Sequence, residues 1–460
     1  MGIPLVRGRD FYRSFCILAG TLILEQAVVL SVNLADNVMI GSYSETALAG
    51  VAAVNQIQFF VQQVAYAISN GLIVLASQYW GQKRTGPIRQ LTSVALSLEL
   101  LFAALLFLVT SLFPERCVGL FLQDPEAVGE GVRYLRILRF TYPFFAVTTV
   151  LLGAMRSVET VRLALGVSVV SLAVNCGINF VLIAGRFGAP ELGVRGAAIG
   201  TLTARILELL LTAYFVFFRD RKLQLKLGGL LRDGRGQWRD YGRTAAPIIL
   251  QGALWGVATA IQTVILGRMS ANAVSAYSIS STVFLLLKVT AVGACTAASI
   301  LVGKQIGSGE RESLRQTVVT LQLLFLGVGL LLGGLLFAVR LPLLSLYQIS
   351  AETYRLANTF LLIQCVVICG MSYQMPTNLG IIRGGGDTRY GMVLDLVSIW
   401  GIVVPLSCLG AFVWDWPPAA VVICLNSDQL FKCVPAVIRA NRYRWVRQLT
   451  REPGNRPDSP

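Results

Sequence analysis

The sequence predicts an all-α integral membrane protein, in which twelve transmembrane helices form two parallel-repeat six-helix lobes around a central cavity. Three observations support this fold class: the composition, the length of the apolar runs and an internal repeat. Of the 460 residues, 55% are hydrophobic and only 14% are charged. Apolar runs of about 20 residues, enough to cross a bilayer as a helix, recur along the whole chain. Because these runs are continuously apolar and do not alternate, a transmembrane β-barrel is excluded.

Twelve apolar runs are long enough to cross a membrane. In chain order, we expect helices at Ser14–Ile40, Val51–Gln78, Leu91–Phe113, Val132–Ala154, Leu163–Ala184, Gly193–Phe217, Thr244–Gly267, Tyr277–Val302, Val318–Val339, Tyr354–Leu379, Gly391–Phe412 and Pro417–Ile438. The N-terminal segment has no small-residue cleavage site followed by a polar chain. The first run is therefore expected to stay in the protein as a helix and not to be removed as a signal peptide.

The net charge of +15 comes from Lys and Arg residues that gather in alternate loops. The loops after spans two, four, six, eight and ten contain Lys83, Arg84, Arg89, Arg156, Arg162, the stretch Arg219–Arg243, Lys304, Arg311, Arg315, Arg383 and Arg389. By the positive-inside rule, these loops and both termini lie in the cytoplasm. The basic balance therefore reflects membrane orientation, and we expect no nucleic-acid partner.

The longest polar stretch, Arg219–Arg243, divides the chain nearly in half. We expect an N-terminal lobe at 1–218, a basic cytoplasmic linker at 219–243, a C-terminal lobe at 244–440 and a cytoplasmic tail at 441–460. The linker is equally consistent with a solvated segment and with one that lies on the anionic inner leaflet.

The two halves repeat at an offset of 226 residues, since Thr21–Gln90 aligns with Pro247–Gln316 without a gap. The alignment rests on shared Gly, Ser and basic residues at fixed spacing: Gly41, Ser44 and Gly81 meet Gly267, Ser270 and Gly307. The stretch around Arg156 likewise resembles the stretch around Arg383, with one residue of slippage. Parallel repeats of this kind are typical of transporters whose site lies between the halves.

Two carboxylates, Glu25 and Asp36, lie in the first apolar run. A charge at membrane depth costs at least about 2.5–3.5 kcal/mol, so an intramembrane Asp is a functional-site hypothesis. Alternatively, Asp36 pairs with a neighbouring helix or stays hydrated near the interface. The repeat replaces Glu25 by Gln251 and Asp36 by Gln262, so a coupling ion is expected in the first lobe.

Span five contains Asn175 and Asn179, which face the same way because they are four residues apart. Their carbonyl oxygens could bind Na⁺ or hold the Asp36 side chain. The alternative is interhelical hydrogen bonding, which contributes about 0.6 kcal/mol for each bond.

Several kinds of chemistry are disfavoured by what the sequence lacks. Gly303-Lys304 is followed by Gln305, so the chain has no phosphate-binding loop and ATP-driven transport is not expected. The sequence contains no His, so proton chemistry must use carboxylates and a Ser/His/Asp enzyme is excluded. We expect a protein that is not an enzyme and has no cofactor. Lys288 is the clear cation of span eight, either as a counter-charge or as a side chain that snorkels.

Several motifs together resemble the multidrug and toxic compound extrusion (MATE) family in its bacterial form. They are ADNVMIGSYSETALAGVAAVNQ, ASQYWGQK, NCGINFVLI, GVRGAAIGTLTAR, LVGKQIGSGE, GGGDTRYGMVLDLVSIW and the RWVRQLT tail. The resemblance covers nearly the whole chain. It implies a multi-pass protein of the bacterial inner or plasma membrane that exports organic cations or other amphiphiles in exchange for Na⁺ or H⁺.

The resemblance also implies a cation site at Asp36, Asn175, Asn179 and Thr201, with Na⁺ on the first three. Relatives often have Asp at position 179, and the Asn here leaves both Na⁺ and H⁺ open as the coupling ion. Some relatives use a carboxylate in span seven, where this chain has Gln251. Coupling through that residue is therefore not expected. Glu25, Gln251 and Lys288 are secondary site candidates.

Three functions compete at this point. The first is a secondary antiporter that works by rocker-switch alternating access, as a monomer, on a small amphiphilic substrate in the lipid bilayer. The second is a lipid-linked saccharide flippase of the same superfamily, whose cavity would need several unpaired cations. The third is a non-transporting membrane scaffold, which needs neither repeated halves nor buried carboxylates.

The topology gives a first prediction. Because the positive charges lie in alternate loops, both termini are expected on the cytoplasmic side. Reporter fusions at each terminus, or labelling of single cysteines placed there, measure the side directly. Either terminus found outside the cell would refute the model.

Overall fold

The computed structural model describes residues 5–122, 124–230, 236–267, 270–345, 347 and 349–451. Within this part of the chain, eleven helical segments are long and apolar enough to cross a membrane. A bent pair of helices brings the number to twelve if it counts as one span. The predicted all-α membrane fold is therefore confirmed.

The N-terminal lobe begins with a long helix hairpin and ends at the linker. Its elements are α1 (Arg9–Gly41), α2 (Glu45–Gly81), α3 (Thr85–Leu112), α4 (Pro114–Gly119), α5 (Pro125–Leu138), α6 (Thr141–Ser157), α7 (Arg162–Leu182), the 3₁₀ turn η1 (Arg186–Gly188), α8 (Val194–Tyr214) and the π-helical η2 (Phe215–Arg219).

The C-terminal lobe follows a short 3₁₀ turn, η3 (Leu227–Gly229). Its elements are α9 (Trp238–Gly267), α10 (Ala271–Ser308), α11 (Arg311–Leu344), α12 (Ala351–Met375) with η4 (Pro376–Ile382), α13 (Thr388–Asp395) with η5 (Leu396–Val403) and α14 (Val404–Phe412), then α15 (Pro418–Asn426), α16 (Asp428–Phe431) and α17 (Cys433–Arg442). The η4 and η5 segments are π-helical, and η4 begins at Pro376, which cannot donate a backbone hydrogen bond.

The fourth predicted span, Val132–Ala154, is not one straight helix. It is split between α5 and α6, which are bent by 54° relative to each other. Pro143 in the first turn of α6 explains the break, because its nitrogen cannot bond to the carbonyl of Arg139 and its ring crowds that carbonyl.

The repeat is visible in how equivalent helices begin. Ser44 caps α2 by accepting a hydrogen bond from the Ala47 N–H, and Ser270 caps α10 by accepting one from the Ala273 N–H, both at 3.3 Å. A side-chain oxygen at this position satisfies a backbone donor that the helix itself leaves free. The two serines are 226 residues apart, so the repeat preserves a local folding signal as well as hydrophobic residues.

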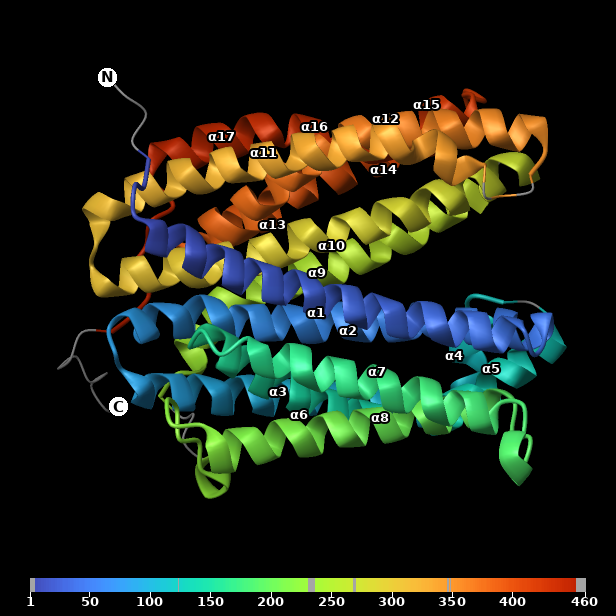
Figure 1. Cartoon of the computed structure of the whole chain (residues 1–460), viewed down its shortest axis with the longest axis horizontal. Helices are drawn as coiled ribbons and strands as arrows, with labels where there is room; N and C mark the ends of the chain where they lie inside the picture. The colour runs from blue at the N-terminus through green and yellow to red at the C-terminus, as the bar shows by residue number, and fades with distance from the viewer. Residues whose placement is uncertain are drawn as a thin grey trace.

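The two lobes meet at the end of the molecule that carries both termini, called the proximal end here. Figure 1 shows α1 and α2 lying against α9 and α10 at this end and diverging from them toward the opposite, distal end. Gly81 of α2 packs on the backbone of Lys304, and Gly307 of α10 packs on the backbone of Gln78. A Cβ atom on either glycine would clash, so glycine permits this close crossing.

The residues Tyr443–Arg451, called the C-terminal strap here, connect both lobes at the proximal end. The Gln78 side chain donates to the Arg447 carbonyl at 3.1 Å and accepts from the Leu449 N–H at 2.8 Å. On the other lobe, the Arg447 N–H donates to the Gly385 carbonyl at 2.9 Å. Residues 452–460 of the predicted tail and 231–235 of the predicted linker lie outside the described residues.

The strap gives a second prediction. Gln78→Leu removes both side-chain hydrogen bonds to the strap, each contributing about 1 kcal/mol, so the proximal ends should separate more often. Double electron–electron resonance measures the distance between spin labels on cysteines introduced at positions 83 and 310, in a background without the native cysteines. The variant should show a larger population at long distance. Gln56→Leu, an exposed position on the same helix, is the matched control. Identical distance distributions in all variants would mean that the strap does not hold the lobes.

Candidate functional site

The four residues of the predicted cation site lie together in the N-terminal lobe. Asp36 is on α1, Asn175 and Asn179 are on α7, and Thr201 is on α8. Asn179 Nδ2 donates to Asp36 Oδ1 at 2.6 Å and lies 3.3 Å from Asn175 Oδ1. Asn175 Nδ2 donates weakly to Thr201 Oγ1 at 3.4 Å. Both Asn side chains are fully buried and Asp36 is 8% exposed, so the cluster is shielded from lipid and bulk water.

A close approach of α8 shapes this cluster. Gly200 lies directly against Asn179 Oδ1, and a Cβ atom there would collide with it. Within the described chain, Asn179 Oδ1 has no hydrogen-bond partner. The cluster therefore contains a carboxylate and, on the Gly200 side of the Asn179 amide, a carbonyl oxygen that accepts no hydrogen bond, and oxygen ligands of this kind suit a hard cation.

Asp36 makes no ion pair within the described residues. Arg205 on α8, a cation of the same lobe, instead pairs with Glu208 at 2.7 Å, as their spacing of three residues predicts. The guanidinium also stacks over the Phe145 ring, 4.8 Å from its centroid. Arg205 is thus already compensated, and Asp36 relies on amide hydrogen bonds.

Glu25, a secondary candidate, has a different environment. It is 2% exposed and pairs with Arg156 at the end of α6. The prediction that Arg156 and Arg383 lie in basic loops is wrong, since Arg156 lies in the last turn of α6, Arg383 directly follows η4, and each residue is only 8% exposed. The error arises because both arginines lie at the ends of apolar runs, where sequence alone does not separate a loop residue from a buried one. Arg311 of the same set has a side chain outside the described part.

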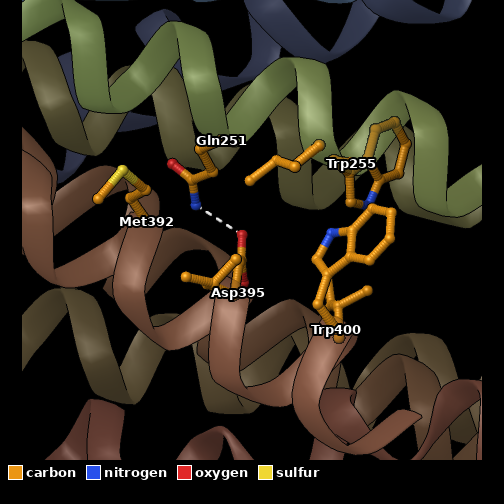
Figure 2. A pocket seen from close by; sticks show the side chains of 8 residues that line it. Gln251, Trp255, Met392, Asp395 and Trp400 are labelled. Carbon is orange, nitrogen blue, oxygen red and sulfur yellow. Dashed lines mark hydrogen bonds between the residues drawn. The ribbon is translucent and has the colours of Figure 1, made fainter. Parts of the chain in front are cut away.

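The C-terminal lobe contains a polar network that the sequence did not predict. Lys432, which lies between α16 and α17, pairs with Asp428 at 2.9 Å and with Asp395 at 2.7 Å. Gln251 of α9 donates to the other oxygen of Asp395 at 2.6 Å, as Figure 2 shows. The Asp428–Lys432 spacing of four residues signalled one of these contacts. The Gln251–Asp395 contact joins residues 144 positions apart and left no local signal.

A small pocket lies beside this network (Figure 2). It is lined by Gln251, Leu254, Trp255, Met392, Asp395, Leu396, Ile399 and Trp400. Its volume is about 10 Å³, measured as the space for the centre of a water molecule, which is room for one water molecule. Two polar atoms of this lining, Gln251 Oε1 and Trp400 Nε1, have no partner within the described chain.

Lys288, the remaining candidate, lies over the Trp255 ring, with Nζ 4.2 Å from the ring centroid. In the described part of the chain it makes no ion pair, so the aromatic face is its stabilising contact. The Trp255 ring in turn lies 5.7 Å from the Phe59 ring of α2, in the other lobe. Lys288 is therefore close to the line along which the lobes meet.

Comparison with known proteins gives this arrangement a family. A family model, MatE, matches the chain twice, at residues 21–181 and 247–409, and the two matches begin 226 positions apart. A similar protein, the "Probable multidrug resistance protein NorM" of Thermotoga maritima, is 23% identical over 431 residues that cover 93% of this chain and 92% of that protein. The "Multidrug resistance protein PmpM" of Pseudomonas aeruginosa is 24% identical over 473 residues, covering 98% and 97%.

The fold agrees with solved structures as well. The crystal structure of the eukaryotic MATE transporter AtDTX14 matches with a TM-score of 0.83 at 17% identity, covering 94% of this chain and 96% of that one. The matches to the family model extend over well more than half of the sequence and repeat at the offset of the two halves. The chain therefore belongs to the MatE family of membrane transporters.

Proposed function

We propose that the protein is a secondary antiporter of the cell membrane, which exports organic cations or other amphiphiles in exchange for Na⁺ or H⁺. The family membership supports transport, and the relatives in Thermotoga maritima and Pseudomonas aeruginosa bear names of multidrug resistance proteins. In this proposal Asp36, Asn175, Asn179 and Thr201 bind the coupling ion.

The observation that supports this proposal most strongly is the state of Asp36. Of the buried carboxylates in its lobe, Glu25 and Glu208 each have an arginine partner, whereas Glu99 and Asp36 make no ion pair within the described chain. Of these two, Asp36 lies in a cluster of amide side chains and accepts a hydrogen bond from Asn179. Burying a carboxylate without a counter-charge is costly, so it is retained where a cation or a proton can occupy it. The unpartnered Asn179 Oδ1 next to it completes a set of oxygen ligands.

Helix α1 provides a physical route from this site to the other lobe. Asp36 lies toward its distal end, and its proximal half packs on α10, where Ile23 contacts Gly293 closely. A cation that draws Asp36 toward α7 and α8 shifts the helix that also contacts the C-terminal lobe. If substrate prefers one of the resulting states, ion and substrate change each other's affinity by the same factor.

Alternating access in this proposal is a rocking of the two lobes. The proximal contact consists of close backbone crossings and the C-terminal strap, which are discrete and can open without unfolding either lobe. Such rigid-body motion of one repeat against the other is the common mode of transporters built from repeats.

The difference between the lobes gives a third prediction. Asp36→Asn should abolish gradient-driven efflux from proteoliposomes, because the neutral amide neither takes up a proton nor attracts Na⁺ by charge. Gln262→Ala, the equivalent position in the second lobe, should have a mild effect. Expression and thermal unfolding of both variants serve as controls. Equal loss of transport in the two variants would show that the carboxylate difference is not the coupling device.

The ligand set gives a fourth prediction. A protonated Asp36 has no charge for Na⁺, so acidification should lower Na⁺ affinity. Asn175→Ala, which removes the support of Asn179, should weaken Na⁺ binding roughly tenfold, or about 1.4 kcal/mol, and proton binding less. Isothermal titration of Na⁺ at two pH values measures both effects. Absence of binding heat at every pH would assign coupling to protons alone and leave the two Asn residues a structural role.

A further inference from the structure

The repeat reveals an imbalance of charge between the lobes. In the N-terminal lobe, Arg156 is neutralised by Glu25. The equivalent arginine of the C-terminal lobe is Arg383, and the residue equivalent to Glu25 is the neutral Gln251. Arg383 is 8% exposed, and its Nε atom has no hydrogen-bond partner within the described chain. The second lobe has therefore kept the cation of the pair and lost the carboxylate.

The carboxylates of the C-terminal lobe interior do not restore the balance. Asp395 and Asp428 share one cation, Lys432, through bonds of 2.7 and 2.9 Å. The second oxygen of Asp395 is occupied by the Gln251 amide. Within the described interior of this lobe, Lys288 is a further cation without a carboxylate in contact. A third buried carboxylate, Asp387, pairs with Arg439 and Arg447, so within the described interior of this lobe Lys288 and Arg383 make no ion pair.

Two donor groups lie next to the Trp255 ring, the Lys288 ammonium and the Trp400 indole N–H, and the same pocket lining holds one unpaired acceptor, Gln251 Oε1. The ammonium group lies over Trp255 and has N–H groups to spare, since an ammonium carries three donors. Trp400 lies beside Trp255 in the same pocket lining (Figure 2), and its Nε1–H donor has no partner within the described chain. A buried indole N–H is normally satisfied, so Trp400 Nε1–H points to an acceptor supplied from outside the chain, and an ammonium group without an ion pair attracts a negative charge.

The location of these groups suits a substrate site. Phe59 and Phe60 of the N-terminal lobe contact Trp255 and Gly256, and Lys288 lies over the Trp255 ring, so Lys288 is near the contact between the lobes. In the proposed rocking motion, separation of the lobes at this contact exposes the ammonium group to a ligand. The two indole rings offer flat apolar surface for the remainder of the molecule.

We propose that Lys288, Trp255 and Trp400 form a subsite for the anionic group of an amphiphilic substrate, such as a carboxylate or a phosphate. This inference rests on the proposed transport function and narrows its substrate class. The anion accepts hydrogen bonds from Lys288 Nζ and Trp400 Nε1–H, and the apolar part of the substrate packs on the rings. The coupling ion at Asp36 and the anionic group at Lys288 then occupy different lobes, so substrates with a negative group do not compete with Na⁺ or H⁺ for one carboxylate.

Binding of two matched probes tests the subsite. The probes are dansyl amphiphiles with the same alkyl chain, one ending in a carboxylate and the other in a trimethylammonium group, and their dansyl fluorescence reports binding to the purified full chain. The unmodified protein should prefer the carboxylate probe. Lys288→Met should lose at least about tenfold in affinity for the carboxylate probe, because a charge-assisted bond is removed, while binding of the trimethylammonium probe stays equal or improves.

Further variants separate recognition from folding. Lys288→Arg should retain the preference for the carboxylate probe, and Trp400→Phe, which keeps an aromatic ring but removes the N–H, should lose part of it. Lys83→Met, an exposed lysine at the proximal end, should behave as the unmodified protein. Equal loss of both probes in Lys288→Met, with Lys288→Arg also impaired, would overturn the proposal and assign Lys288 a structural role.

Two comparisons complete the design. The first repeats the probe-binding assay on protein in lipid nanodiscs, with and without phosphatidylglycerol. If the natural ligand is an anionic lipid, phosphatidylglycerol should displace the carboxylate probe, whereas it should not do so if the ligand is a soluble substrate. The binding assay requires no ion gradient. Absence of the carboxylate preference in a protein that still performs Asp36-dependent antiport would therefore overturn the subsite alone. A carboxylate preference without antiport would support the subsite and refute the proposed coupling.

Discussion

The cost of burying charge in the membrane-spanning lobes is the constraint on which both interiors depend. A charged group removed from water is costly unless another group compensates it. Glu25 binds Arg156, Glu208 binds Arg205, and Lys432 binds two carboxylates at once. The Glu25–Arg156 and Asp395–Lys432 pairs also join helices that are distant in sequence, whereas Arg205–Glu208 is a pair within α8. Within the described residues, Glu99, Arg383, Asp36 and Lys288 make no ion pair, and the proposals assign ligands to Asp36 and Lys288.

The membrane fold could be predicted from the sequence because its determinants are local. A run of about 20 apolar residues specifies a spanning helix wherever it occurs. Basic residues in alternate loops indicate the direction in which each helix crosses the membrane. The offset of 226 residues then related the halves, and the family model matches at the same spacing. The break between α5 and α6 was missed although its cause, Pro143, is visible in the sequence, because a proline in the first turn of a helix is often tolerated.

The candidate site was accessible to sequence reasoning only in part. Asn175 and Asn179 share a helix face by their spacing, and Asp36 was conspicuous in an apolar run, so their contact was a natural expectation. The network around Asp395 was not accessible, because Gln251 and Lys432 come from distant helices and no spacing relates them. The burial of Arg156 and Arg383 likewise depends on how α6 and η4 pack, which hydropathy does not encode.

The glycine crossing at the proximal end has the geometry of a dimer interface. Gly81 packs on Lys304 and Gly307 packs on Gln78, and the partners of one contact are the repeat equivalents of the partners of the other. Ser77 and Gly303, themselves equivalent, touch where the two contacts meet. In a symmetric homodimer, each surface contact is made twice about a twofold axis in this way. The crossing thus has pseudo-twofold symmetry within one polypeptide, so the two repeats contact each other through equivalent residues although their interiors differ in charge.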